Sequence, residues 1–163
     1  MAPLDSLTTP VTIDLDARGI HYRTFTHPGQ VRSLEQAAME RGQSPDQVVR
    51  SILFRLPEQE FVMVLVSGPD QISWAELRRH LGVSRITMAT QDEVLQATGY
   101  LPGSVAPFGL PAPIRILIDR RVFEQQDVSL GSGVRNTTII LRSEELRRAL
   151  GNAEVGCFVS CPD

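Results

Sequence analysis

One uncharged stretch that is rich in glycine and proline is a candidate for chemistry in this sequence. Residues 98–109 read TGYLPGSVAPFG and contain three glycines, two prolines and no charged residue. Connecting loops face water and are usually polar, whereas glycine lets the backbone approach a ligand closely and proline stiffens the chain. The spacing Gly103-x-x-x-Pro107 fits two structures. One is a tight, half-buried connection, which the loop alone favours, and the other is a stiff loop whose backbone N–H groups point at a bound group.

A single arginine interrupts an apolar, strand-like segment. Arg50 lies in the run VVRSILF, with hydrophobic residues on both sides. Because burying an unpaired charge is very costly, Arg50 must face solvent, pair with a carboxylate, or line a pocket that receives an anion. All 16 basic residues are arginines, so lysine chemistry is excluded, but arginine binds phosphate or carboxylate through a bidentate fork.

The other candidate side chains are small or isolated. His27 precedes a proline at the end of a strand-like segment, where a turn residue is the more common outcome than a catalyst. Ser51 and Thr138 are ordinary strand residues unless they share a pocket with the loop. Cys157 and Cys161 have the spacing C-x-x-x-C, but two ligands without partners do not make a zinc site. We therefore expect reduced thiols, no metal and no cofactor.

Short helices and strands alternate irregularly and must position these residues. The pattern S/T-x-x-E/Q occurs at Ser33, Ser73 and Thr90 and predicts the beginnings of helices that end at glycines 42, 82 and 99. Further helices are expected at 10–18 and, capped by Ser143, at 144–150, with a helical turn at 120–126. Strands are expected at 20–26, 48–56, 60–67, 85–89, 114–119, 136–141 and near 155–160, with 48–56 and 60–67 as a hairpin. Residues 128–134 are rich in glycine and serine, and no strand is predicted there. Since hairpins and crossovers mix, the pattern predicts an α+β domain with a mixed sheet.

Length and charge limit the class of protein. A chain of 163 residues fits one domain, and a net charge of −3 argues against a general nucleic-acid coat, although a local basic patch is allowed. The arginine pairs at 78–79, 120–121 and 147–148 are expected on solvated faces. No apolar run approaches the roughly 20 residues that span a bilayer. The N-terminus lacks the basic-then-apolar pattern of a secretory signal. We expect a cytoplasmic protein with no membrane or DNA partner.

Four segments taken together resemble one family. SPDQVVRSILFR, TGYLPGSVAPFG followed by IRILID, SLGSGVRNTTIIL and SEELRRAL occur in matching order and spacing over about residues 10–150. They resemble the YbaK/ProX-type aminoacyl-tRNA deacylases, which also occur as the editing insertion of bacterial prolyl-tRNA synthetases. The resemblance implies a mixed, barrel-like sheet surrounded by short helices, as a single domain over residues 1–163.

The resemblance also implies an activity and a site. The activity is hydrolysis in trans of the ester between a wrong small amino acid, such as alanine or cysteine, and tRNA, with tRNA-Pro as the expected carrier. The partners are the tRNA acceptor end and an aminoacyl-tRNA synthetase. Backbone amides of the Gly103–Pro107 segment sit at the scissile carbonyl, and no side-chain general base is needed. The implied site residues are Gly103 and Arg50 as catalytic residues, with His27, Ser51, Ser104, Val105, Pro107 and Thr138 binding the substrate.

The sequence departs from the family at two positions. Arg50 stands where these deacylases usually carry a lysine, and Thr138 stands where an acidic residue is usual. Arginine keeps the charge but is bulkier and cannot place it in the same way. Two alternatives therefore stay open. One is a relative without catalysis that binds a small ligand, tRNA or a protein as a regulator, and the other is a hydrolase of a different aminoacyl ester.

Overall fold

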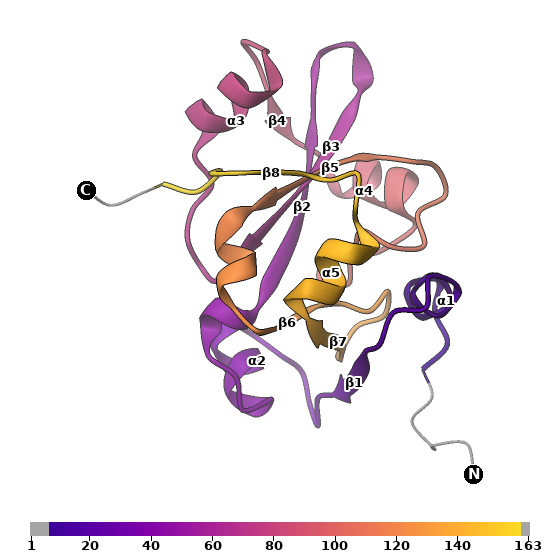
Figure 1. Cartoon of the computed structure of the whole chain (residues 1–163). Coiled ribbons are helices and arrows are strands. Elements are labelled where there is room, and N and C mark those ends of the chain that lie inside the picture. Colours follow the sequence, from indigo (N-terminus) through magenta and orange to yellow (C-terminus); the bar gives the residue numbers. More distant parts are fainter. Residues whose placement is uncertain (1–6, 161–163) are drawn as a thin grey trace.

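The structure is a computed structural model that describes residues 7–160. Its helices are α1 (Pro10–Ala17), α2 (Leu34–Glu40), α3 (Trp74–Leu81), α4 (Gln91–Thr98) and α5 (Ser143–Ala149). Its strands are β1 (Arg23–Thr26), β2 (Val49–Arg55), β3 (Phe61–Ser67), β4 (Thr87–Met88), β5 (Arg115–Asp119), β6 (Asp127–Gly131), β7 (Thr137–Arg142) and β8 (Glu154–Gly156). Figure 1 shows the β2–β3 hairpin running through the centre, with α2 near one end of it.

The strands form two sheets that meet at one point. The first has the order β1-β7-β6 and is antiparallel, and the second has the order β4-β2-β3-β5-β8. In the second sheet β2 runs antiparallel to β3 and β4, whereas β5 runs parallel to β3 and β8. Within residues 7–160 one isolated bridge, between Val48 and Ser129, joins the two sheets. The predicted α+β class with a mixed sheet is confirmed, but over residues 7–160 no ladder closes the sheets into a barrel.

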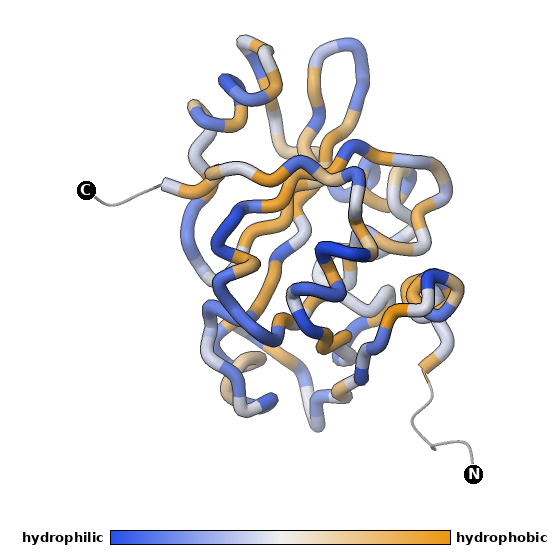
Figure 2. The backbone as a smooth tube through the Cα atoms, viewed as in Figure 1, coloured by the Kyte–Doolittle hydropathy of each residue, from blue (hydrophilic) through white to orange (hydrophobic). Residues whose placement is uncertain are grey.

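Strand β3 lies at the centre of the core because both of its faces are covered. Its sequence FVMVLVS is a continuous apolar run, which is typical of a strand buried on both sides. Met63 and Leu65 pack into one hydrophobic cluster, and Val62, Val64 and Val66 pack into another. This alternation follows the two-residue period of a strand. Figure 2 shows that hydrophobic residues follow these central strands.

The predicted helix beginnings are confirmed in position but differ in detail. At Thr90 the capping box is reciprocal, because the Thr90 hydroxyl accepts from the Glu93 N–H and Glu93 accepts from the Thr90 N–H. Ser33 accepts from the Gln36 N–H, but the Gln36 side chain turns to Arg32 instead of closing the box. The first turn of α2 is thereby linked to the chain segment that follows β1.

One strand was not predicted from its composition. β6 occupies residues from the Gly/Ser-rich segment and is the partner of β7, in register from Asp127 opposite Arg142 to Gly131 opposite Thr138. Its small residues are required by tertiary packing, which often overrides strand propensity. A Cβ on Gly131 would lie 2.2 Å from the carbonyl oxygen of Val105. The segment therefore contains glycine, a residue with low strand propensity, because the 98–109 loop packs closely against it.

Candidate functional site

A cavity of about 570 Å³ opens where the two sheets meet. Its walls come from the start of β2, the strands β6 and β7, the helix α2 and the 98–109 loop. Six of the eight residues predicted for the site line it: His27, Arg50, Ser51, Gly103, Val105 and Thr138. The structure thus brings together residues that are up to 111 positions apart in the sequence, from His27 to Thr138.

Ser104 and Pro107 do not line this cavity. Ser104 is buried, its hydroxyl donates to the Leu101 carbonyl oxygen at 2.8 Å, and its own carbonyl accepts from the Gly133 N–H. Pro107 is buried and lines a second cavity of about 590 Å³ together with Asp14. Both residues therefore shape the loop from within, and they do not face the space where a ligand would bind.

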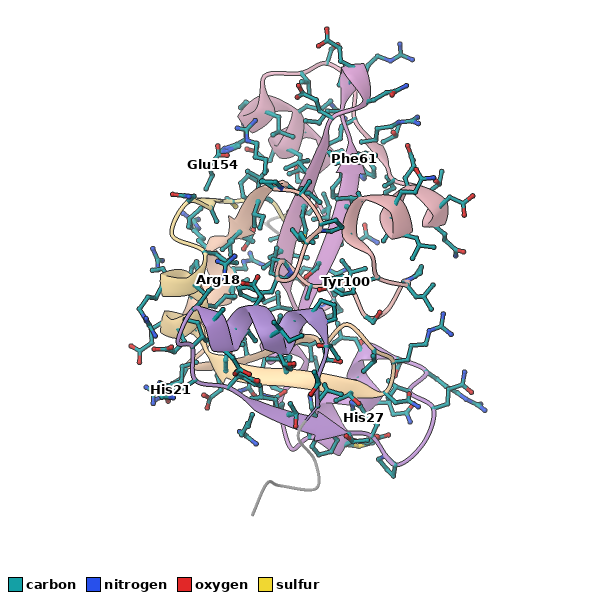
Figure 3. The ribbon with its side chains drawn as sticks, turned by 90° about the vertical axis from the view of Figure 1, so that its right-hand side faces the viewer. Arg18, His21, His27, Phe61, Tyr100 and Glu154 are labelled. Atoms are coloured by element: carbon teal, nitrogen blue, oxygen red, sulfur yellow. The ribbon has the colours of Figure 1, made fainter. Side chains whose placement is uncertain are left out.

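Internal hydrogen bonds hold the 98–109 loop in one shape. The Tyr100 hydroxyl donates to the Phe108 carbonyl oxygen at 2.5 Å, and the Gly109 N–H donates to Oδ2 of Asp14 in α1 at 2.8 Å. Burial, helped by the Asp14 carboxylate, raises the pKa of Tyr100 to about 12, so its hydroxyl keeps its proton. Figure 3 shows Tyr100 next to α1, near the middle of the molecule. The predicted stiffness of the loop is seen in these contacts.

Two N–H groups of the loop that have no partner among residues 7–160 belong to residues that line the cavity. The Ser104 N–H donates to the Leu101 carbonyl oxygen at 3.1 Å and is already used. Within residues 7–160 the N–H groups of Gly103 and Val105 have no hydrogen-bond partner, and both residues line the cavity. Gly103 has φ +90°, a conformation that favours glycine. The loop therefore offers two N–H groups at the cavity.

Gly131 supports the loop from β6, and sequence reasoning missed it. The position of its Cβ would lie 2.2 Å from the Val105 carbonyl oxygen and 2.8 Å from that of Ser104. Any side chain at this position would push the loop out of place. The only signal in the sequence was the glycine itself within a Gly/Ser-rich run.

Arg50 is half-buried and is one of the residues that line the cavity. Its Nε donates to the Gly68 carbonyl oxygen at 2.8 Å and its Nη2 donates to the Asp70 carbonyl oxygen. Among the described residues its Nη1 has no hydrogen-bond partner. Burial lowers the pKa of Arg50, while the charge of Asp70 opposes this shift. Arginine stays protonated at any physiological pH, so Arg50 places a positive charge at the cavity.

Ser51 presents a hydroxyl that the protein leaves unsatisfied. Its Oγ is enclosed and has no hydrogen-bond partner in the described part of the chain. An unsatisfied buried polar group costs about 1–3 kcal/mol, so such groups in native structures need an explanation. Because Ser51 lines the cavity, a bound ligand is one group that could pair with it.

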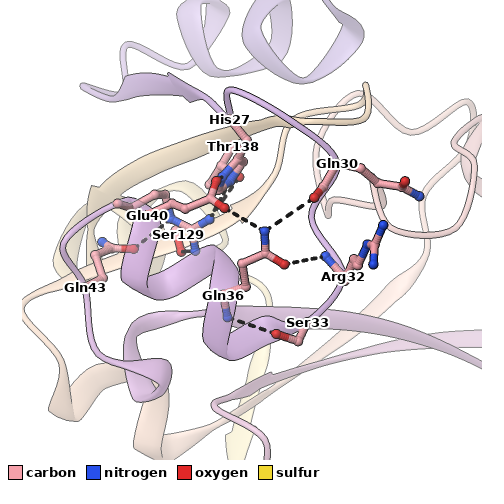
Figure 4. A network of polar contacts seen from close by, with 10 residues as sticks. His27, Gln30, Arg32, Ser33, Gln36, Glu40, Gln43, Ser129 and Thr138 are labelled. Atoms are coloured by element: carbon pink, nitrogen blue, oxygen red, sulfur yellow. Dashed lines mark hydrogen bonds and ion pairs between the residues drawn. The ribbon is translucent and has the colours of Figure 1, made fainter.

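A polar network at the cavity includes two residues that sequence reasoning missed, Glu40 and Arg41. Figure 4 shows Glu40 of this network together with His27 and Ser129. Arg41 ends α2, and its guanidinium donates to His27 Nε2 at 3.0 Å and to the Ser129 hydroxyl at 2.8 Å. His27 Nδ1 lies 2.8 Å from Glu40 Oε1. In the sequence Arg41 precedes Gly42 and resembles an ordinary basic residue at a helix C-terminus, so nothing indicated that it belongs to the site.

Residues 7–160 contain no group of three or more histidine, cysteine or acidic residues that could hold a metal ion. No helix there is both long enough and apolar enough to cross a bilayer. Cys157 is partly buried after β8, and Cys161 lies outside the described residues.

Comparisons with known proteins identify a family. The model of the aminoacyl-tRNA editing domain matches residues 28–149. The proline–tRNA ligase of Trichlorobacter lovleyi is 31% identical over 109 residues, and that of Kosmotoga olearia is 35% identical over 92 residues. These matches cover 67% and 56% of this chain but only 19% and 16% of the ligases. The chain thus corresponds to a small part of these curated relatives.

A solved structure extends the similarity to the whole fold. The crystal structure of a candidate trans-editing enzyme for prolyl-tRNA synthetase superposes with a TM-score of 0.86 and 25% identity, over 96% of this chain and 100% of the other. The resemblance drawn from the four sequence segments is confirmed by both kinds of comparison. The cavity residues from Pro102 to Thr138 and those from Gln30 to Ser51 all fall inside the matched range. The chain therefore belongs to the aminoacyl-tRNA editing domain family.

Proposed function

We propose that this chain hydrolyses, in trans, the ester of mischarged aminoacyl-tRNA. The substrate is a small amino acid, such as alanine or cysteine, carried on tRNA-Pro. The observation that carries the proposal is that Gly103 and Val105, whose N–H groups have no partner within residues 7–160, line the same cavity as Arg50. The proposal takes residues 1–163 as one editing unit in the cytoplasm, with the tRNA acceptor end and a synthetase as partners.

The reaction needs a place for the oxygen that becomes negative. Water adds to the ester carbonyl carbon, the carbonyl oxygen takes up negative charge, and the bond to the ribose oxygen then breaks. The products are a free amino acid and a tRNA with both terminal hydroxyls restored. Preorganised N–H donors stabilise such an oxyanion, and the loss of one donor typically costs about 10²–10³ in rate. In our proposal Gly103 and Val105 supply these donors.

The proton transfers do not require a side-chain base in this scheme. The family resemblance implies that the neighbouring ribose hydroxyl and a water positioned by the backbone take part. His27 is the histidine of the cavity, and its Nε2 already accepts from Arg41. The small polar side chains Ser51 and Thr138 would position the substrate, because both line the cavity and the Ser51 hydroxyl has no partner among the described residues.

Arg50 would bind a phosphate of the acceptor end. Its Nη1, which has no partner within residues 7–160, and its charge suit a phosphate oxygen, since charge-assisted hydrogen bonds are about twice as strong as neutral ones. The arginine at this position replaces the lysine that is usual in the family, and its other nitrogens hold the backbone of Gly68 and Asp70.

A second candidate function rests on these same two contacts. An arginine whose Nε and Nη2 are already used has less freedom to follow a substrate than a lysine would have. The chain could then be a relative with altered or absent catalysis that binds tRNA or a small ligand as a regulator. In that case ligands would stabilise the protein against heat without being hydrolysed.

A deacylation panel distinguishes the two functions. Alanyl-, cysteinyl-, seryl- and prolyl-tRNA-Pro would be incubated with the wild type and with Arg50→Lys, and release of the amino acid would be followed. Hydrolysis of the alanyl or cysteinyl ester in preference to the prolyl ester supports the editing function. No hydrolysis of any ester by the wild type, together with thermal stabilisation by tRNA, would support the regulator. Greater activity of Arg50→Lys would show that the arginine weakens catalysis.

A further inference from the structure

The guanidinium of Arg41 is nearly saturated with hydrogen bonds to one wall of the cavity. Its Nε donates to Gln43 Oε1 at 3.0 Å and its Nη2 donates to Ser129 Oγ at 2.8 Å. Its Nη1 donates to His27 Nε2 at 3.0 Å and, at a longer 3.4 Å, to Thr138 Oγ1. Among the described residues no carboxylate pairs with Arg41 directly. Burial lowers its pKa, and the charge of Glu40 opposes this shift.

These contacts fix the tautomer of His27. Arginine has no acceptor atom, so His27 Nε2 must accept and its proton must be on Nδ1. That Nδ1–H donates to Glu40 Oε1 at 2.8 Å, and Glu40 Oε2 in turn accepts from Gln36 Nε2 at 2.8 Å. The hydrogen bond from His27 lowers the pKa of Glu40, which is therefore ionised at neutral pH. The His27 ring is buried, and its edge packs against Phe25.

The same argument fixes the direction of two hydroxyl groups. The oxygens of Ser129 and Thr138 accept from Arg41, so each hydroxyl keeps its own proton for another partner. Neither hydroxyl donates to another side chain or carbonyl in the described part of the chain. Both residues line the cavity. These two hydroxyls can therefore donate hydrogen bonds to a ligand in the cavity. The N–H groups of Gly103 and Val105 on the loop can do the same.

The wall made by Arg41 is also connected to the loop. Thr138 is paired with Gly131 across the β6–β7 ladder, and Gly131 is the residue whose missing side chain lets the Val105 carbonyl approach. Thr138 is therefore directly opposite the residue that contacts the loop, and a shift of the Thr138 hydroxyl would occur close to the loop. The main-chain N–H of His27 donates to the Asn136 carbonyl oxygen at 2.7 Å, which holds the backbone of His27 beside the residue that precedes β7.

We propose that Arg41 is a positioning residue of the cavity: oriented by Glu40 through His27, it holds the Ser129 and Thr138 hydroxyls as hydrogen-bond donors toward the bound substrate. The identity of that substrate, an ester with several acceptor oxygens, rests on the proposed function. The inference has a second consequence for His27. Because its Nε2 lone pair is used by Arg41, His27 orients the arginine and does not take a proton from the attacking water.

The tautomer can be measured without any substrate. Long-range ¹H–¹⁵N NMR correlations of the ligand-free protein would report which ring nitrogen of His27 carries the proton. The expected result is the Nδ1–H form in the wild type and a mixture of tautomers in Arg41→Met. A wild type with the proton on Nε2 would overturn the network, whatever the activity of the protein.

The positioning role can be measured by kinetics with matched variants. Arg41→Met should lower kcat about tenfold to a hundredfold, as expected when a reacting group is misplaced, with KM changed less than about threefold. Arg41→Lys keeps the charge without the planar fork, so its kcat should lie between those of the wild type and Arg41→Met. The control is Arg32→Met, since Arg32 is exposed and does not line the cavity. It should behave as the wild type.

The role of His27 is tested by a side chain with the same donors and acceptors. His27→Gln offers one amide oxygen to accept from Arg41 and one amide N–H to donate to Glu40, so it should retain most of the activity. His27→Ala should lose as much as Arg41→Met. Equal losses in His27→Gln and His27→Ala, in proteins that unfold at the wild-type temperature, would contradict a positioning role, as would an unchanged kcat in Arg41→Met.

Failure of the proposed function would be recognised separately. If the wild type hydrolyses no ester but His27 shows the Nδ1–H tautomer, the proposed function is wrong and the network stands. Binding of 3′-alanylamino-3′-deoxyadenosine, an amide analogue of the ester end, would then be measured by calorimetry. About tenfold weaker binding to Arg41→Met than to the wild type would support the positioning role. Equal affinity would overturn it.

Discussion

At the scale of single residues, Gly103 and Gly82 share a backbone conformation but not a location. Both have positive φ, +90° and +68°, and at both a Cβ would meet no atom within 4 Å. Gly103 lines the cavity, whereas Gly82 ends α3. Alanine in the left-handed region costs about 1–2 kcal/mol. We expect similar losses of unfolding free energy for Gly103→Ala and Gly82→Ala in urea denaturation, since neither change creates a clash. A much larger loss at Gly103 would mean that the loop does more for stability than its contacts indicate.

Arg50 is a second residue with a measurable role. If its Nη1 binds a phosphate of the tRNA, Arg50→Ala should weaken binding and reduce the slope of log K against log salt by about 1. The measurement is the affinity for uncharged tRNA-Pro at several salt concentrations. Arg115→Ala is a useful control, because Arg115 pairs with Glu154 and does not line the cavity. Equal salt slopes for the wild type and Arg50→Ala would rule out the phosphate contact.

The sequence allowed some of these residues to be predicted and concealed others. Gly103 and Arg50 were predictable because a glycine beside prolines and a charge inside an apolar strand are both unusual in their local context. Arg41 was not predictable, because an arginine at the end of a helix is ordinary until the tertiary structure brings it to His27. Ser104 was predicted as a substrate contact because the family resemblance covers the Gly103–Pro107 segment, but the hydroxyl of Ser104 donates inward to Leu101.

At the scale of elements, the site depends on β6 packing against the 98–109 loop. Gly131→Ala would place a methyl group 2.2 Å from the Val105 carbonyl oxygen, so the loop or the strand must move. Overpacking of this kind costs about 1–3 kcal/mol, and we expect that loss together with reduced hydrolysis. Gly151→Ala is the control, since its nearest neighbour would be 3.9 Å away and its effect should stay within about 0.5 kcal/mol. Equal unfolding free energies for the two variants would contradict the packing described.

Most elements could be predicted from local patterns, and the exception is informative. Capping residues and C-terminal glycines predicted the helices, and apolar runs predicted β2, β3 and β5. β6 could not be predicted, because its glycine and serine residues serve contacts with the loop and with Arg41, which lie far away in the sequence. Local propensity fails at this strand because tertiary contacts determine its composition.

At the scale of the whole molecule, an ion cluster joins the last strand to two other elements. Glu154 of β8 accepts from Arg115 of β5 at 2.6 and 2.8 Å and contacts His80 of α3 at 3.1 Å. The hydrogen bonds from Arg115 lower the pKa of Glu154 to about 2, from an ordinary value of 4.5. A carboxylate whose pKa is lowered in the folded state adds stability above pH 4.5, and that stability is lost as the pH falls toward 2.

This linkage gives a prediction about pH. At pH 7 the wild type should be more stable than Glu154→Gln by less than about 1 kcal/mol, because the side chain is 39% exposed and water screens the pair. The difference should shrink as the pH falls from 4.5 to 2. Denaturation curves of both proteins at several pH values provide the measurement. A difference that is constant from pH 7 to pH 2 would show that packing, and not the charge of Glu154, is responsible.

The class of the whole fold was predictable, but the arrangement of its sheets was not. Irregular alternation of strands and helices indicated a mixed α+β domain. The parallel pairing of β5 with β3 and of β8 with β5 joins segments that are distant in the sequence. Local patterns do not encode such pairings, because loop lengths and the burial of both faces decide them. For the same reason the junction of the two sheets, and with it the cavity, became visible only in the folded chain.

We propose that backbone N–H groups at Gly103 and Val105 catalyse ester hydrolysis by this chain. The most direct test is single-turnover hydrolysis of alanyl-tRNA-Pro by the wild type, Gly103→Ala and Gly82→Ala, without a synthetase. Alanine keeps the N–H of residue 103, but its methyl group would occupy open space at the cavity and hold the ester carbonyl away from the donors. We therefore expect hydrolysis by the wild type, a similar rate for Gly82→Ala, and a rate about 10²–10³ lower for Gly103→Ala, as when an oxyanion donor is lost. Equal rates for Gly103→Ala and Gly82→Ala would contradict the claim.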